Sequence, residues 1–383
     1  MRSLVRGVRR AFTLSAAASL LLVGTAAPSS AQVVFTVERC GETVSGNVRL
    51  TGDLDCRDLD NWFDENGDES YGAYHLTPYS LRVEGSGTID LNGYTIITGP
   101  ILDVDYEYDA GQDRNEIGGY LFTWTGEALS TYDPDGDDDD EFDFYPSIGV
   151  LVEDSVNVTV RNGVVRGARG DWAYEALDIE GLAGNQVLVV NSRDVVLEDL
   201  AVSENANIMG SGPGVMTDLS DVDNAFDGSG VAVVASDRVS IARVDSFRND
   251  GSGLTIYASR DIDIIESSFN DNDGRGIFIA GGYDNPFDYY DFTWSGFRAS
   301  RDIDMTDVET VSNGSSGIRV VFNLEWYCYV VDSGDDFCFF PDVAFELPRN
   351  GGGTWTNVTS MSNDGDGIYL DGSEDITIQD SYL

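Results

Sequence analysis

A short pattern of alternating apolar residues occurs six times in the sequence, and this repeat restricts the fold more than any other feature. Each copy starts at a serine, and the third and fifth residues after that serine are aliphatic or methionine. The residues between them are mostly polar. The six serines are Ser155, Ser192, Ser236, Ser259, Ser300 and Ser373. Alternation with a period of two is typical of a β-strand that buries one face. The pattern therefore predicts an equivalent strand in each repeat.

A second apolar strand precedes these serines, and a polar turn with an asparagine precedes that strand. The second strands are Gly230–Val233, Gly253–Ile256, Gly276–Ile279, Gly317–Val320 and Gly367–Leu370. The first three of these glycines are 23 residues apart. Coils of about 23 residues with three short strands and three corners predict an all-β parallel β-helix, because a β-propeller blade needs about 40 or more residues. We expect the asparagines of the turns to stack and hydrogen-bond at one corner.

The N-terminal part of the chain carries a resemblance to a known family. Val48–Cys56 reads VRLTGDLDC, and Gly87–Ile96 reads GTIDLNGYTI. A cysteine-containing strand followed by such a first coil resembles the entry of right-handed parallel β-helix proteins of the pectate-lyase-like superfamily. Within it, the chain is most similar to the group of carbohydrate-binding proteins and sugar hydrolases. The resemblance extends from about Cys40 to Leu383, apart from the insertions. It implies a right-handed solenoid and selects no function, since this scaffold hosts lyases, hydrolases, esterases, epimerases and adhesins.

The first 31 residues have the form of a signal peptide. Four arginines precede the apolar stretch Ala16–Ala27, and Ser29–Ala31 is a small-residue cleavage site. The apolar stretch is too short to span a bilayer. Arg9 and Arg10 also resemble a twin-arginine signal, with a general secretory signal as the alternative. The sequence therefore predicts a secreted or cell-surface protein.

The remaining chain is expected to alternate coils with insertions. We assign 32–99 to an N-terminal cap and the first coils, and 100–146 to an acidic, tyrosine-rich insertion. Parallel β-helix coils are expected over 147–383. Further insertions are predicted near 204–229, 283–297 and 324–350. Insertions in a solenoid tend to lie on one face, which is often the binding face.

The charge of the chain is strongly negative, which indicates a salt-rich habitat. The sequence has 68 Asp and Glu against 22 basic residues, which are all arginine, for a net charge of −46. Such a surface repels polyphosphates and anionic lipids, so neither nucleic-acid binding nor membrane insertion is expected. At molar salt the Debye length falls to about 3 Å and screens the repulsion between carboxylates. The composition therefore predicts a halophilic protein.

Four cysteines in an exported chain favour disulfides. Their spacing predicts two local bridges, Cys40–Cys56 and Cys328–Cys338. Other pairings of the four remain open at this stage. A zinc site is the weaker alternative, because the sequence has no CxxC motif and only one histidine, His75.

The two C-terminal insertions are rich in aromatic residues that can stack on sugar rings. The candidate ligand-binding residues are Tyr289, Tyr290, Trp294, Trp326 and Tyr327. The alternative is that these side chains pack the insertions onto the solenoid. The expected partner is a polysaccharide or a glycan or protein of a cell surface.

An aspartate run in the acidic insertion resembles calcium-binding loops in its alternation of carboxylates around a glycine turn. The candidate ligands are Asp133, Asp135, Asp137 and Asp139. Calcium is the one cofactor that the sequence suggests. The alternative is a solvated acidic surface, which is common in halophilic proteins.

Two pairs of carboxylates are candidates for catalysis. Asp263 and Asp304 occupy equivalent positions in adjacent coils, and Glu266 and Asp307 form a second such pair. Adjacent coils are about 4.8 Å apart, and a retaining glycosidase needs carboxyl groups about 5–5.5 Å apart. The alternative is that acids align by chance on so acidic a chain. The Gly-His-Gly motif of related hydrolases is missing, because His75 lies upstream of the coils.

Two functions therefore remain open. The first is a non-catalytic extracellular solenoid that binds glycans or surface partners. The second is a glycoside hydrolase or lyase that uses acidic residues on the β-helix face.

Overall fold

A computed structural model describes residues 34–56, 79–98, 148–170, 184–207, 228–283, 297–321, 328–331, 335–338 and 349–383. Over these residues the regular structure consists of β-strands, as predicted. No helix in this described part is long and apolar enough to cross a membrane.

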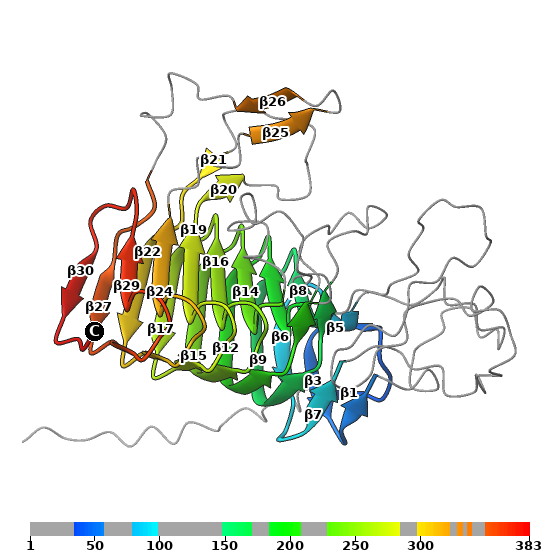
Figure 1. The fold of residues 1–383 in the computed structure, drawn as a ribbon. Helices are drawn as coiled ribbons and strands as arrows, with labels where there is room; N and C mark the ends of the chain where they lie inside the picture. Colours follow the sequence, from blue (N-terminus) through cyan, green and yellow to red (C-terminus); the bar gives the residue numbers. More distant parts are fainter. Residues whose placement is uncertain are drawn as a thin grey trace, which may run out of the picture. The chain divides into compact units, whose positions relative to one another are not determined.

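The described strands assemble into two large parallel sheets, in which each strand pairs with its equivalents in the preceding and following coils (Figure 1). The nine-stranded sheet contains, in order, β2 (Glu42–Val44), β5 (Tyr79–Val83), β8 (Ile148–Glu153), β11 (Val187–Val190), β14 (Val231–Val234), β16 (Leu254–Tyr257), β19 (Ile277–Ala280), β24 (Ile318–Val321) and β29 (Ile368–Leu370). The last five of these correspond to the second strands that the sequence predicts.

The fifteen-stranded sheet holds the strands that follow the repeated serines. Its main path is β1 (Val34–Val37), β3 (Asn47–Leu50), β6 (Gly87–Asp90), β9 (Val156–Arg166), β12 (Arg193–Ser203), β15 (Asp237–Phe247), β17 (Arg260–Ile265), β22 (Arg301–Thr306), β27 (Thr354–Thr356) and β30 (Thr377–Gln379). Beside this path lie β4 (Leu54–Asp55), β7 (Thr95–Ile97), β18 (Ser268–Asn270), β23 (Glu309–Val311) and β28 (Thr359–Met361).

Three short pairs complete the described strands. They are β10 (Arg169–Gly170) with β13 (Ala206–Asn207), β20 (Gly282–Tyr283) with β21 (Phe297–Arg298), and β25 (Cys328–Val331) with β26 (Asp335–Cys338). The first pair is parallel, and the other two are antiparallel.

The predicted alternation places the apolar columns inside the solenoid. Val239 pairs with Val195 on one side and with Ile262 on the other, and all three side chains are at most 1% exposed. The polar residues between the apolar positions face outward. Near the C-terminal end Trp355 is buried in this core, and its indole Nε1 donates a hydrogen bond to the Ile303 carbonyl at 3.1 Å. Burial of these columns supplies the main hydrophobic stabilisation of the coils.

The predicted asparagine stack is present at the corner before the nine-stranded sheet. Asn249 Nδ2 donates to Asn272 Oδ1 at 2.9 Å, Asn272 Nδ2 donates to Asn313 Oδ1 at 3.1 Å, and Asn313 continues to Asn363 at 2.9 Å. The backbone N–H groups of the first three also donate to the next asparagine. The ladder therefore provides partners for buried amide groups that have no access to water, except at its first member, where Asn249 Oδ1 has no hydrogen-bond partner among the described residues.

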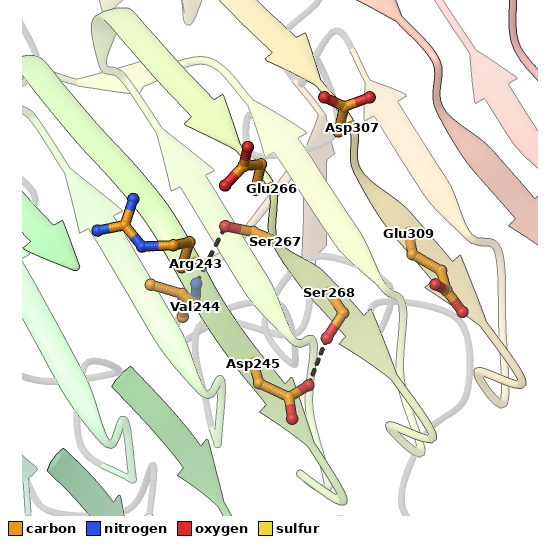
Figure 2. Close-up of a pocket in the computed structure, with 8 residues that line it drawn as sticks. All are labelled: Arg243, Val244, Asp245, Glu266, Ser267, Ser268, Asp307 and Glu309. Carbon is orange, nitrogen blue, oxygen red and sulfur yellow. Dashed lines mark hydrogen bonds between the residues drawn. The ribbon is translucent and has the colours of Figure 1, made fainter. Parts of the chain in front are cut away.

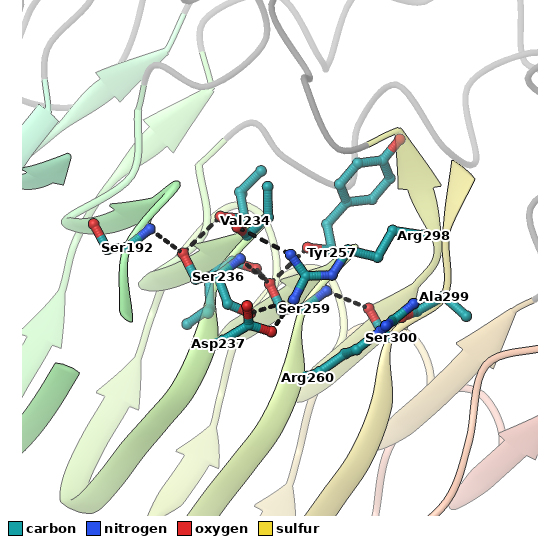
Figure 3. A network of polar contacts seen from close by, with 12 residues as sticks. Ser192, Val234, Ser236, Asp237, Tyr257, Ser259, Arg260, Arg298, Ala299 and Ser300 are labelled. Carbon is teal, nitrogen blue, oxygen red and sulfur yellow. Dashed lines mark hydrogen bonds and ion pairs between the residues drawn. The ribbon is translucent and has the colours of Figure 1, made fainter. Parts of the chain in front are cut away.

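The repeated serines form a second ladder at the opposite end of the same sheet (Figure 3). The backbone N–H of Ser192 donates to Ser236 Oγ at 3.0 Å, and that of Ser236 donates to Ser259 Oγ at 3.0 Å. Ser259 continues to Ser300 at 3.2 Å. Each of these serine hydroxyls also donates to a carbonyl of its own coil or the preceding one. The residue that marks the repeat in the sequence is thus a structural part of the corner.

The central strands of the nine-stranded sheet are buried on both faces. All four residues of β14 are 0% exposed, although alternate side chains of a strand point to opposite faces. The outward side chains form an apolar cluster that includes Leu188, Val234 and Phe278. Continuous apolar strands such as VLVV, VAVV and IFIA are typical of sheets that are covered on both sides.

The segments between the described ranges interrupt the coils only beside this sheet. Four of them, 57–78, 99–147, 171–183 and 208–227, come just before a strand of the nine-stranded sheet. Segments 284–296 and 322–327 follow such a strand. The third corner of each coil lies between two segments of the fifteen-stranded sheet, as between β17 and β18. From β9 onward, all residues at this corner are described, so none of the gaps falls there.

One predicted disulfide is confirmed. Cys40 and Cys56 are joined, with an S–S distance of 2.03 Å. Cys328 and Cys338 are partners in the β25–β26 pair. A bridge between them agrees with that register and stays a prediction.

Candidate functional site

The outer surface of the fifteen-stranded sheet is hollowed between β15 and the turns that join β17 to β18 and β22 to β23 (Figure 2). The depression has a volume of about 470 Å³. Its lining residues are Arg243, Val244, Asp245, Glu266, Ser267, Ser268, Asp307 and Glu309. Four of the eight are acidic and one is basic, so the depression suits a polar ligand.

A repeated backbone turn aligns the charged residues of this depression. Arg243, Glu266 and Asp307 have φ values of 53°, 48° and 57°, which lie in the left-handed region. Equivalent residues of the other coils adopt the same conformation, and we call the set the corner column. Its members are Asn92, Asn162, Asp199, Arg243, Glu266, Asp307, Asn357 and Asp380. Six of the eight are Asn or Asp, in line with the preference of these types for this region, and the exceptions are Arg243 and Glu266.

Arg243 is bound firmly to the preceding coil. Its Nε donates to Asp199 Oδ1 at 2.6 Å, and its Nη2 donates to Asp199 Oδ2 at 3.0 Å. This bidentate hydrogen bonding lowers the pKa of Asp199. Hydrogen bonding to Asp199, together with the negative charges of Asp199, Glu198 and Glu266, raises the pKa of Arg243. The guanidinium therefore stays charged at one end of the depression.

The two carboxylates that follow in the corner column differ in their partners. Asp307 accepts a hydrogen bond from Asn357 Nδ2 of the next coil. Among the described residues, none donates a hydrogen bond to the carboxylate of Glu266, which lies between Arg243 and Asp307 in Figure 2. Glu266 and Asp307 directly follow Ile265 and Thr306, which are paired between adjacent strands. Their predicted positions in adjacent coils are confirmed, and their catalytic role stays a prediction.

The second predicted pair lies in the same sheet, outside the depression. Asp263 and Asp304 are partners between β17 and β22, and both are exposed. Asp304 Oδ1 accepts a hydrogen bond from the Thr354 N–H at 2.6 Å. Partial loss of hydration, and then the charges of Asp304 and Asp261, raise the pKa of Asp263. This pair is therefore a site of like-charge repulsion.

Replacing one carboxylate of this pair should stabilise the protein. The raised pKa means that the folded state binds a proton at Asp263 more tightly than the unfolded state does. The ionised carboxylate of Asp263 therefore destabilises the folded state at pH values above the ordinary Asp pKa. We expect Asp263→Asn to raise Tm by on the order of 1 °C at neutral pH, because exposed substitutions typically change stability by about 0.5 kcal/mol or less. Thermal melts at several salt concentrations would show the gain shrinking as salt increases. A fall in Tm would contradict this account.

Other predicted site residues fall outside the described ranges. These are Tyr289, Tyr290, Trp294, Trp326 and Tyr327, and the candidate calcium ligands Asp133, Asp135, Asp137 and Asp139. Within the described ranges, no group of three or more His, Cys, Asp or Glu side chains is arranged to hold a metal ion.

Two arginine–aspartate pairs that border the acidic surface are not among the residues predicted from the sequence. Arg238 binds Asp194 through Nε at 2.6 Å and Nη2 at 2.9 Å, as Arg243 binds Asp199. Both pairs join residues 44 positions apart. Ser192 and Ser236, which mark equivalent positions in adjacent coils, are separated by the same number of residues. An alignment of these two repeats therefore places each arginine at the position equivalent to its aspartate, and this signal could have predicted both pairs.

Comparison with known proteins supports the architecture. Residues 141–293 match the family model described as "Right handed beta helix region". The chain forms a right-handed parallel β-helix. The fold implied by the resemblance to the pectate-lyase-like superfamily is thereby confirmed. No curated protein is significantly similar to the chain in sequence.

Several solved β-helix structures are distantly similar. A mutant of the periplasmic alginate epimerase AlgG has 10% identity and a TM-score of 0.41, with coverage of 89% of this chain and 70% of that one. Tailspike protein 2 of bacteriophage CBA120 has 9% identity, a TM-score of 0.41, and coverage of 91% and 37%. The A-module of mannuronan C-5 epimerase AlgE6 from Azotobacter vinelandii has 12% identity, a TM-score of 0.32, and coverage of 91% and 88%. No function follows from similarities this low.

Proposed function

We propose that the protein is an exported, halophilic β-helix that binds an extracellular polysaccharide or a cell-surface glycan without turning it over. The observation that carries this proposal is the placement of the insertions. They interrupt the coils only beside the nine-stranded sheet, and the last two contain Trp294 and Trp326 by sequence. These two leave the solenoid at the same corner, after the strands β19 and β24, which are paired in adjacent coils. Insertions at one corner of a solenoid often form its binding face.

Aromatic stacking suits this ligand and this medium. A sugar ring offers C–H groups to an aromatic face, and the contact needs no ionised group. In strong salt, attraction between charges is screened within a few ångströms, whereas apolar contacts persist. In strong salt, Tyr and Trp side chains are therefore better suited to bind a glycan than the charged side chains of the depression are.

Export is supported by two features. The first 31 residues read as a signal peptide. The Cys40–Cys56 disulfide favours an oxidising compartment.

Retention on polysaccharide columns tests the proposal. We expect Trp294→Ala and Trp326→Ala each to weaken retention in molar salt about tenfold, which corresponds to about 1.4 kcal/mol for one lost stacking contact. Asp263→Asn and Asp304→Asn are matched controls on the opposite, charged sheet and should leave retention nearly unchanged. Equal retention of the wild type and both tryptophan variants across a polysaccharide panel would refute the aromatic site.

The alternative function, a polysaccharide hydrolase or lyase, is favoured by one observation. Glu266 and Asp307 occupy adjacent coils in the depression, where the strand spacing of about 4.8 Å approaches the carboxyl separation of retaining glycosidases. Assays for new reducing ends or unsaturated ends decide this point. Product formation by the wild type that is lost in Glu266→Gln or Asp307→Asn would establish the enzyme and overturn the non-catalytic proposal.

A further inference from the structure

The sequence contains three copies of the triplet Asn-x-Thr/Ser, which is the acceptor motif for covalent N-glycosylation of exported proteins. The copies are Asn157-Val158-Thr159, Asn313-Gly314-Ser315 and Asn357-Val358-Thr359. All three lie in the described coils, and the fold places their asparagines in different surroundings. Because the triplet also occurs by chance, these surroundings decide which asparagine can accept a sugar.

The middle triplet is closed to modification in the folded protein. Asn313 is 1% exposed and belongs to the asparagine ladder. Its Nδ2 donates to Asn363 Oδ1 at 2.9 Å and to the Phe269 carbonyl at 3.0 Å. A buried amide nitrogen that already uses both of its hydrogens cannot bond to a sugar unless the ladder opens. Asn313 is therefore an internal negative control.

The other two triplets share their sequence and their local backbone. Both read Asn-Val-Thr, and Asn157 and Asn357 are exposed with φ values of 58° and 55°. In each triplet the valine is buried, whereas the threonine is partly exposed. The asparagine and the threonine of each triplet therefore both face outward, as an acceptor site requires. What distinguishes the two sites is their neighbours in the adjacent coils.

Asn157 has small or neutralised neighbours. In the preceding coil it lies beside Gly85–Gly87, which reads Gly-Ser-Gly and has no side chain larger than serine. In the following coil its neighbour is Asp194, because the residues on either side of the two are paired. Arg238 of the next coil binds the Asp194 carboxylate at 2.6 and 2.9 Å. Among the described residues, none accepts a hydrogen bond from Asn157 Nδ2, so this amide is available to react.

Asn357 is more restricted than Asn157. Its Nδ2 donates to Asp307 of the preceding coil, so the amide must give up this hydrogen bond before it reacts. Its neighbour in the following coil is Asp380, because the residues just before the two, Thr356 and Gln379, are paired. The sugar donor in N-glycosylation carries a diphosphate, and carboxylates on both sides oppose its close approach.

We propose that Asn157 is a glycosylation site, to which an oligosaccharide is attached during export, and that Asn313 and Asn357 stay unmodified. In this reaction the Asn157 amide nitrogen forms a bond to the anomeric carbon of a sugar held on a lipid diphosphate. The bond between that carbon and the diphosphate breaks, and the amide loses one proton. A membrane-bound transferase supplies the catalysis. The inference concerns a covalently attached glycan and does not depend on the proposed binding function.

The position of Asn157 gives such a glycan a role in hydration. The outward column beside it is uncharged over four successive coils, where it consists of Thr88, Thr159, Val196 and Ser240. In the two coils that follow, the same column carries Asp263 and Asp304. Carboxylates thus hydrate the later coils, and the hydroxyl groups of an attached glycan supply hydration where the carboxylates are missing.

Mass spectrometry of the protein secreted by its native organism tests the inference, with Asn157→Asp, Thr159→Val and Asn357→Asp as variants. Aspartate keeps the preference for positive φ and lacks the amide nitrogen, and valine keeps the shape of threonine and lacks its hydroxyl. We expect a glycan mass on the wild-type peptide that contains Asn157, and its complete loss in Asn157→Asp and in Thr159→Val. Asn357→Asp is the matched control and should keep this mass. Circular dichroism in molar salt should match the wild type in every variant, which separates lost modification from misfolding.

Three outcomes overturn the inference. The first is a wild-type Asn157 peptide with the mass of the unmodified chain. The second is a glycan on Asn313, because the ladder would then have to open. The third is a glycan mass that persists in Asn157→Asp and is lost in Asn357→Asp. None of these outcomes bears on retention by polysaccharide columns, so the proposed function is tested separately.

Discussion

Below roughly 0.5 M salt, the protein should lose the circular dichroism of its β-sheets. The chain has a net charge of −46, and carboxylates line up on adjacent coils of the fifteen-stranded sheet. The exposed carboxylates at three equivalent positions of two adjacent coils are Asp261, Asp263, Glu266, Asp302, Asp304 and Asp307. Strands about 4.8 Å apart hold these charges well within the Debye length of about 10 Å at 0.1 M salt, but beyond that of about 3 Å at 1 M.

Circular dichroism and thermal melts over a series of salt concentrations measure this effect. The double variant Asp263→Asn with Asp304→Asn should shift the midpoint to lower salt, because it removes one pair of facing charges. A spectrum and a Tm that do not change in dilute buffer would overturn the prediction of halophily.

Asn272→Ala should destabilise the protein by about 3 kcal/mol or more. Asn272 is 1% exposed and lies in the middle of the asparagine ladder. Its Oδ1 accepts from the backbone N–H and the Nδ2 of Asn249, and its Nδ2 donates to Asn313 Oδ1 and the Ser246 carbonyl. Truncation leaves several buried groups without partners, and each costs about 1–3 kcal/mol.

Urea denaturation in molar salt measures this loss, and Asp273→Ala is the matched control. Asp273 is the next residue in the same turn, and it is exposed. Its truncation should change the free energy of unfolding by about 0.5 kcal/mol or less. Similar losses in the two variants would mean that the ladder contributes little to stability.

The strands and one corner could be predicted because their signals are local and repeated. Val195 and Leu197 reveal an inward face by alternation, and the later coils repeat this face at equivalent positions. Asn249 and Asn272 are one coil apart in the sequence, so a stack follows once the coil length is known. Cys40 and Cys56 are close enough in the chain for a local bridge to be the simplest pairing.

The corner column and the ion pair between Arg298 and Asp237 could not be predicted for physical reasons. Arg243 and Glu266 adopt positive φ at a turn that is repeated from coil to coil, although neither residue type favours that conformation by itself. Arg298 and Asp237 are 61 residues apart and two coils removed, so no period relates them. The burial of β14 on both faces agrees with its continuous apolar run VAVV, which lacks the polar alternation of the strands after the repeated serines.

The direction of the two side-chain ladders has a consequence for how this molecule can change over evolution. In both ladders the donor lies in one coil and the acceptor in the next, at a separation of 23 residues where no insertion intervenes. Gain or loss of a whole coil leaves every donor facing an acceptor. Gain of a single residue inside a strand turns the following side chains to the wrong face. Lengthening by duplication of coils is therefore tolerated more readily than the smallest insertion within one.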